Sequence, residues 1–307
     1  MFGEVHTELL WHSASVSNAS AKRILSFRLG DDIRSSTRPT SFAISPDLYD
    51  GLDCRIGGGA RHRAVGTAAS FASITGGQIA QAVTMTSIVH GENNRRMPWS
   101  YYLSRPGQVE TIGSEPDWEN LAGGWVSADK AGPNLGAISD RLLDTVQMSP
   151  QLSGTAAVRR TGRARLRWSY ARSSEPVRLT YSLESEDLRV LRLTGGDLRP
   201  RAVADFAADL ALHDWLLTAL VEAIDRSGLE AGGGPATVQR LRPVIVHLLH
   251  HWMPAARLDV EGTELWRGLD AAAGLSRQWE SLVARVRDQL ALSTIGLLGS
   301  VALPENA

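Results

Sequence analysis

The chain has 307 residues with a formal net charge of −1, and 43% of the residues are hydrophobic and 21% charged. This composition supplies a packed core and excludes a disordered chain, and the near-neutral charge excludes a global field that would attract nucleic acid or an anionic membrane. Cys54 is the only cysteine, which excludes a disulfide framework and a zinc site built from several cysteines.

The first predicted element is an extended segment over residues 3–12. Its apolar and polar residues alternate, with Val5, Thr7 and Leu9 set against Glu4, His6 and Glu8. This alternation is typical of a strand with one apolar and one polar face. A short helix is expected next over residues 19–29, and a strand over 40–45.

A long β-hairpin is the clearest local prediction. Residues 64–74 and 78–90 are rich in Ala, Val, Thr and Ser and flank Thr75-Gly76-Gly77, a favourable turn sequence. An amphipathic helix is expected over residues 135–146. Because glycine and proline punctuate the weakly patterned stretch between 91 and 153, a domain boundary is predicted near residue 150. The predicted domains are therefore residues 1–150 and 151–307.

The second domain is predicted to open with a β-meander and to continue as helices. The meander would use residues 162–171, 177–184 and 188–194. After Pro200 the apolar residues recur at three- and four-residue spacing, which predicts helices over 200–228, 235–252, 263–272 and 276–292. The expected fold class is α+β, with an antiparallel β-rich N-terminal half and a small β-meander leading into an α-helical bundle.

Four residues could form a metal-dependent catalytic centre: His213, Asp214, His247 and His251. His247 and His251 are four residues apart, so on a helix they would share a face and could ligate one metal. The set is similar to that of metal-dependent phosphohydrolases of the HD superfamily, in which the metal activates water. However, the isolated upstream histidine of that superfamily has no counterpart between His90 and His213. The alternative is that His213, in the middle of an apolar stripe, is a hydrogen-bonded core residue.

An arginine cluster over residues 159–172 is the second candidate site. On a strand, Arg163, Arg165 and Arg167 would project from one face and could grip phosphates or an acidic partner. The alternative is that acidic residues of adjacent strands neutralise the three arginines.

No motif for a cofactor or a serine nucleophile stands out. The glycine-rich stretch 57–67 lacks the Gly-Lys-Ser/Thr ending of a phosphate-binding loop, and no Gly-x-Ser-x-Gly sequence occurs. No cofactor and no resident metal are therefore expected.

The N-terminus lacks a basic segment followed by an apolar one, and the longest uncharged apolar segment, 290–303, falls short of the ~20 residues that span a bilayer. We expect a cytoplasmic protein.

Several stretches carry a family resemblance over nearly the whole chain. They are residues 3–10, 43–46, 51–54, 98–103, 211–217, 252–254 and 287–290. Through them the chain resembles an uncharacterised actinobacterial protein family, with no assigned activity, that is encoded beside a variant P-loop protein. The scarcity of lysine, with Lys22 and Lys130 the only two among 32 basic residues, is typical of a GC-rich genome and agrees with such a source.

The sequence therefore favours a non-catalytic adaptor or scaffold of a multi-protein system. Its expected partners are proteins of the same gene cluster, including the variant P-loop protein, and a second copy of the chain; neither a membrane nor nucleic acid is expected. The tryptophan-rich helices and the apolar C-terminal segment favour this interpretation. Two alternatives stay open: a metal-dependent phosphohydrolase that uses the histidine group, and polyanion binding through the arginines.

Overall fold

A computed structural model shows the arrangement of the chain. It describes residues 1–11, 15–57, 62–92, 95–126, 133–152, 162–227, 239, 241 and 248–301, with the backbone alone for 293 and 295–301. The statements that follow concern these residues.

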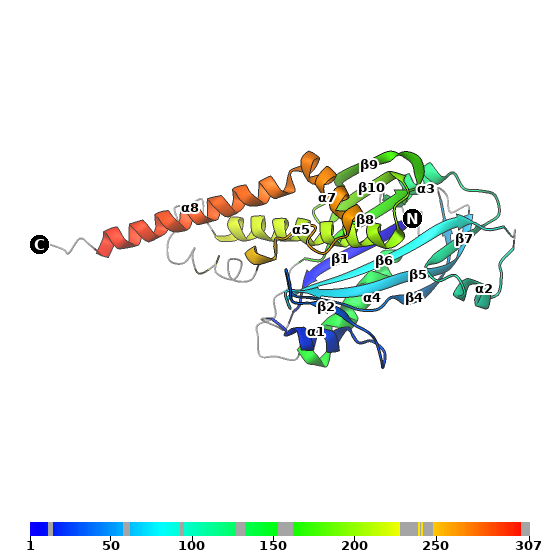
Figure 1. Cartoon of the computed structure of the whole chain (residues 1–307), viewed down its shortest axis with the longest axis horizontal. Coiled ribbons are helices and arrows are strands. Elements are labelled where there is room, and N and C mark those ends of the chain that lie inside the picture. Colours follow the sequence, from blue (N-terminus) through cyan, green and yellow to red (C-terminus); the bar gives the residue numbers. More distant parts are fainter. Residues whose placement is uncertain are drawn as a thin grey trace, which may run out of the picture.

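In the part of the chain that the structure describes, ten strands form one mixed sheet at the centre of the molecule (Figure 1). They are β1 (Phe2–Leu9), β2 (Arg34–Ser36), β3 (Phe42–Ile44), β4 (Leu48–Ile56), β5 (His62–Thr75), β6 (Ile79–His90), β7 (Gln108–Ile112), β8 (Ala164–Ala171), β9 (Ser173–Leu183) and β10 (Leu188–Gly196). Their spatial order is β2-β3-β5-β7-β6-β1-β8-β10-β9, and β4 lies beside β5.

The predicted hairpin is confirmed as β5 and β6, with Phe71 opposite Val83 in the antiparallel register. Gly76 and Gly77 make the turn with φ angles of 60° and 66°, a left-handed conformation that glycine adopts without steric cost. At the far end the two arms separate, and β7 fits between them, antiparallel to β5 and parallel to β6. The antiparallel half is therefore a partly mixed sheet.

The three strands predicted near the start of the second half are present, but their meander order is wrong. β8 pairs antiparallel with β1, β10 pairs parallel with β8, and β9 pairs antiparallel with β10 at the sheet edge. Burial explains this order. Leu188, Val190, Leu191 and Leu193 of β10 are buried, whereas nearly all residues of β9 are exposed or half-exposed, so β10 gains more from the interior position.

Strands from both sides of residue 150 thus belong to the same sheet, because β8 continues it directly from β1. The predicted division into residues 1–150 and 151–307 does not coincide with a break between sheets. The expected α+β class holds, but the two parts share one framework.

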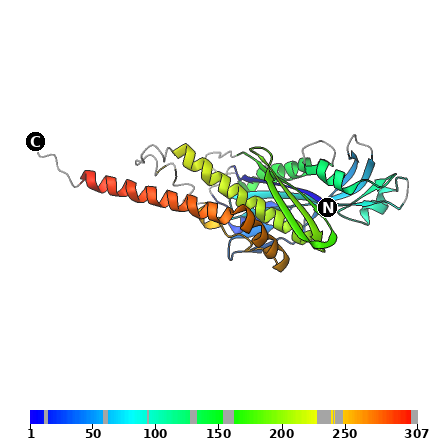
Figure 2. The same cartoon turned by 90° about the horizontal axis from the view of Figure 1, so that it is seen from above.

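Helices cover both faces of the sheet (Figures 1 and 2). One face carries α1 (Asn18–Leu25), α3 (Trp118–Val126) and α4 (Leu135–Gln147), and the other carries α5 (Pro200–Ser227), on which α7 (Val260–Ala273) and α8 (Leu275–Val301) pack. The short α2 (Trp99–Leu103) contacts β5. α5 lies directly on the sheet, so the predicted bundle shares its core with the strands.

Helices predicted at 135–146, 200–228 and 263–272 are confirmed within a few residues by α4, α5 and α7. The helix predicted at 276–292 is present as α8, but it continues to Val301. Most of the helix predicted over 235–252 lies outside the described residues, and its described end contains one short 3-10 helix, η3 (Leu249–His251). In the part of the chain that the structure describes, no helix combines the length and the apolar character needed to cross a membrane.

Gly3 of β1 leaves room for a large aromatic side chain on the neighbouring strand β8. It lies opposite Trp168, which is fully buried, and a Cβ added at Gly3 would lie 2.3 Å from the indole ring. The pairing of the N-terminal strand with the second half of the chain therefore requires glycine here.

We predict that Gly3→Ala lowers the free energy of unfolding by about 1–3 kcal/mol, because the buried indole must shift to admit the methyl group. Gly268→Ala is the control, since Gly268 lies in the exposed interior of α7 with open space around it; it should raise stability by about 0.5–1 kcal/mol. Urea unfolding of both variants measures the difference. Equal stability of Gly3→Ala and wild type would contradict the close approach of Trp168.

Candidate functional site

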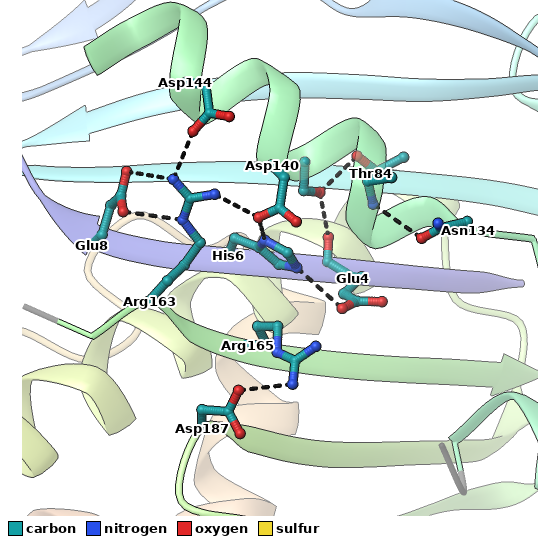
Figure 3. A network of polar contacts seen from close by, with 12 residues as sticks. Glu4, His6, Glu8, Thr84, Asn134, Asp140, Asp144, Arg163, Arg165 and Asp187 are labelled. Carbon is teal, nitrogen blue, oxygen red and sulfur yellow. Dashed lines mark hydrogen bonds and ion pairs between the residues drawn. The ribbon is translucent and has the colours of Figure 1, made fainter. Parts of the chain in front are cut away.

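The three arginines of the predicted binding cluster lie on one face, and each guanidinium meets a carboxylate. Figure 3 shows Arg163 and Arg165 with their partners. Arg163 donates two hydrogen bonds to Glu8, at 3.0 and 3.1 Å, and further bonds to Asp140 and Asp144. Arg165 binds Asp187 at 2.7 Å, and Arg167 binds Glu4 at 3.3 Å and lies over the ring of Trp125. Their charges are thus engaged within the chain, and their predicted role in binding a partner stays a prediction.

The carboxylates come mainly from β1 and α4. Glu4, His6 and Glu8 alternate onto the face of β1 that α4 covers, and each is at most 2% exposed. Asp140 and Asp144 are four residues apart on α4, so they share the helix face that meets the strand. Sheet and helix are therefore joined by a polar layer, which we define as Glu4, His6, Glu8, Asp140, Asp144, Arg163 and Arg167.

His6 lies at the centre of the polar layer between two carboxylates. Its Nδ1 is 2.8 Å from Oδ1 of Asp140, and its Nε2 is 3.1 Å from Oε1 of Glu4. An ionised carboxylate only accepts hydrogen bonds, so both ring nitrogens must donate and the ring is an imidazolium. Burial by itself lowers the pKa of His6, but the hydrogen bonds to Asp140 and Glu4 outweigh it, and the pKa is raised above 6.5.

The pKa values of the two carboxylates that contact His6 are lowered. The hydrogen bond from His6, supported by Arg163, lowers the pKa of Asp140 to about 2. Burial would raise the pKa of Glu4, but His6 and Arg167 together hold it below 4.5. The contacts therefore favour the charged forms of His6, Asp140 and Glu4, and the polar layer acts as an electrostatic clamp between α4 and the sheet. With His6 only 1% exposed, its proton is closed off from a substrate.

His213 and Asp214, the predicted catalytic pair, make separate sets of contacts. His213 is 1% exposed, its Nδ1 donates to the backbone oxygen of Asp209 at 2.7 Å, and its Nε2 accepts from the backbone N–H of Met253 at 3.2 Å. Both nitrogens of the neutral ring are thus engaged, and burial lowers its pKa. The ring packs edge-on against Trp252 and Trp266, as expected for a core histidine.

Asp214 belongs to a different cluster because neighbouring residues on a helix do not share a face. Its carboxylate accepts from Arg189 at 2.8 Å and from the Tyr181 hydroxyl at 2.6 Å. Burial raises the pKa of Tyr181, and the charge of Asp214 adds to this effect. This cluster attaches β9 and β10 to α5.

The remaining histidines of the predicted metal set are only partly described. His251 is buried against the hairpin turn, where a Cβ added at Gly76 would lie 2.0 Å from its ring, and His247 lies outside the described residues. Over the described ranges, no group of three or more His, Cys, Asp or Glu side chains could hold a metal ion. The complete four-residue set therefore stays a prediction.

The long helix α8 begins inside the body and extends away from it at the end opposite α2 (Figures 1 and 2). Trp279 and Val286 are buried, and the Trp279 ring stacks on that of Trp252 at 4.5 Å. Further along, Leu292 is 63% exposed. From residue 289 to 303 the sequence holds no charged residue.

The polar layer was not predicted from the sequence. The alternation of Glu4, His6 and Glu8 along β1 is visible in the sequence, but such a face is ordinarily the solvated one. Asp140 and Asp144 at helical spacing were a second signal. Only the packing of α4 on β1 brings these two patterns together, because the segments are more than 130 residues apart in sequence.

Searches for similar proteins found no match to a family model, a curated protein or a solved structure. The resemblance to an actinobacterial family therefore stays a prediction.

We predict that His6 makes stability depend on pH. Because the folded pKa of His6 is raised, its contribution to stability is full below pH 6.5 and is lost as the pH rises through the folded pKa. The folded pKa values of Asp140 and Glu4 are lowered, so these carboxylates contribute fully above pH 3.8 and 4.5, respectively. Their contributions are lost as the pH falls through the folded pKa values. The clamp is therefore strongest between about pH 4.5 and 6.5. His213, buried in its neutral form, acts in the opposite sense to His6, since it reduces stability as the pH falls below 6.5.

Urea unfolding across a pH series, for wild type and His6→Gln, isolates the His6 contribution. The stability difference between the two proteins should shrink as the pH rises above 6.5, whereas His90→Gln, at an exposed position, should leave the wild-type profile unchanged. A wild-type minus His6→Gln difference that stays constant from pH 5 to pH 10 would be inconsistent with a buried imidazolium.

We also predict that Arg163→Gln costs roughly 3 kcal/mol of stability, because it leaves the buried carboxylate of Glu8 without its cationic partner. Arg172→Gln is the matched control from the same arginine cluster: Arg172 is 69% exposed and pairs with the exposed Asp197, so less than about 1 kcal/mol should be lost. A stable Arg163→Gln variant with weakened, salt-sensitive binding to duplex DNA would instead favour the polyanion alternative.

Proposed function

We propose that this chain is a non-catalytic adaptor that acts through protein–protein contacts, with the outer part of α8 as its contact element. The observation that carries this proposal is a helix that leaves the body of the protein and continues through an uncharged, largely apolar sequence. A surface helix ordinarily presents charged residues to water.

Exposed apolar residues on such a helix favour a partner. Each Å² of apolar surface removed from water is worth about 25 cal/mol, so covering Leu292 and its apolar neighbours in sequence would stabilise a complex. An apolar helix that lies in a hydrophobic groove is a common recognition mode, with contacts spaced by three or four residues. The partner we propose is a protein of the same gene cluster that offers such a groove.

The polar candidates support this proposal indirectly. The guanidinium groups of Arg163, Arg165 and Arg167 are engaged with carboxylates of the same chain, and the two ring nitrogens of His213 are engaged with backbone groups. Each of these groups would have to break an internal bond to serve as a ligand or a catalyst. Binding through α8 has no such cost.

The test is affinity purification of the tagged full-length chain from its native host, with quantitative mass spectrometry. We expect one or more co-purified proteins near equimolar amounts, and a loss of about tenfold or more with Leu292→Glu, because a buried charge at an interface anchor is costly. Leu103→Glu is the matched control, since Leu103 is also 63% exposed but lies at the other end of the molecule.

Recombination of the purified partner with wild type and both variants, followed by calorimetric titration, then separates a direct contact from an indirect one. A chain that purifies alone and sediments as a monomer would contradict the adaptor proposal. Partner binding that Leu292→Glu leaves unchanged would contradict the role of α8.

A further inference from the structure

A cavity of about 200 Å³ lies on the α5 face of the sheet, opposite the polar layer. Its floor is a row of neighbouring strand residues, and its wall is formed by α5 and the segment before α7. In the floor, Ile44, Ser73 and Gln81 follow one another across β3, β5 and β6, with Phe42 and Phe71 to either side. The cavity is smaller than the roughly 300–1,000 Å³ of sites for drug-sized molecules, which favours a small metabolite.

Two buried oxygen atoms of the lining have no hydrogen-bond partner: Oδ1 of Asp209 and Oε1 of Gln81. Asp209 is 2% exposed and Gln81 1% exposed. The orientation of the Gln81 amide is fixed, because its nitrogen donates to the backbone oxygen of Ala208 at 2.9 Å and to the hydroxyl of Thr7 at 3.1 Å. The other Asp209 oxygen is held by the backbone N–H of Ala255 at 2.8 Å.

Unpaired buried acceptors are costly, at about 1–3 kcal/mol each and more for a charged group. Both residues line the same cavity, so a single ligand there would neighbour both side chains. Their two oxygens accept hydrogen bonds, and a carboxylate together with an amide oxygen is well suited to a primary ammonium group.

The cavity also carries positive charge next to these acceptors. Arg257 Nη2 is 3.8 Å from Oδ1 of Asp209, an approach longer than a hydrogen bond, while its Nη1 donates to Thr75 at 2.9 Å. Burial lowers the pKa of Arg257, with Asp209 and Asp205 opposing this effect. Arg34, from the edge strand β2, lines the same cavity. Asp205 lines the cavity as well, and its carboxylate is paired with Arg201. An anionic group would therefore find its counter-charges in Arg257 and Arg34.

We propose that this cavity binds a free α-amino acid with an apolar side chain. In an α-amino acid the ammonium and carboxylate groups are attached to the same carbon, so they need an anion and a cation that lie side by side. Asp209 with Gln81 and Arg257 with Arg34 supply these two halves. The side chain of the ligand packs against Phe42, Phe71 and Leu258, the apolar part of the lining.

The experiment is calorimetric titration and thermal unfolding of the full-length protein with L-leucine, L-isoleucine, L-valine, L-methionine and L-phenylalanine. At least one should bind and raise the unfolding temperature, because a ligand of the native state stabilises it. For leucine, isoamylamine lacks only the carboxylate and isocaproate lacks only the ammonium group. Each analogue should bind at least about tenfold more weakly, the cost of losing a charge-assisted bond.

Asp209→Asn is the key variant. The amide oxygen can keep the bond to Ala255, while its NH2 group replaces the acceptor that lacks a hydrogen bond, so amino-acid affinity should fall by about tenfold or more. Asp225→Asn, at an exposed position of the same helix, should bind like wild type. Arg34→Ala provides a second test that does not disturb the core, because Arg34 is exposed on a short edge strand; it should weaken binding several-fold.

Three results would overturn the proposal. They are the absence of binding by every amino acid of the panel, an isoamylamine affinity equal to that of leucine, and affinity that both Asp209→Asn and Arg34→Ala leave unchanged. If Asp209→Asn does not fold, Arg34→Ala and the two leucine analogues decide the question. None of these results depends on whether α8 binds a partner.

Discussion

The burial of β1 on both faces is the constraint on which the rest of the structure depends. This strand is the junction of the sheet, with β6 from the first half on one side and β8 from the second half on the other. One of its faces carries Val5 and packs against α5, and the other carries Glu4, His6 and Glu8 under α4. Buried charged groups are stable only when each meets a partner. The partners here are Arg163, directly before β8, Arg167 on β8, and two aspartates on α4.

The buried polar groups on the two faces of the sheet differ in how fully they are paired. Under α4 the carboxylates of Glu4, Glu8 and Asp140 all meet cationic partners, so this layer has a structural role. On the α5 face, Asp209 and Gln81 each have one buried oxygen without a hydrogen bond, and both residues line a cavity, although Arg257 lies 3.8 Å from the Asp209 oxygen. Buried acceptors ordinarily have hydrogen-bond partners, as the polar layer does. The two oxygens without a hydrogen bond therefore favour a ligand as the missing partner.

α5 connects these features to the helices that carry the proposed contact element. One side of it holds the neutral His213 in the core with Trp252 and Trp266, and Asp214 projects elsewhere to anchor β10 through Arg189. The indole of Trp252 in turn stacks on Trp279 near the start of α8. The aromatic cluster thus fixes the base of α8, from which the uncharged part of the helix extends beyond the body.

The sequence by itself determined the local elements: the β5–β6 hairpin, the helices α4, α5, α7 and α8, and the shared face of Arg163, Arg165 and Arg167. These follow from periodicity and turn chemistry, which act over a few residues. The tertiary structure alone decided that β10 lies between β8 and β9, that a single sheet crosses residue 150, and that Asp140 meets His6. It also decided which polar face is buried and that Asp209 and Gln81 line one cavity. The physical reason is that strand order and charge pairing depend on competition for burial among segments far apart in the chain, which no local pattern records.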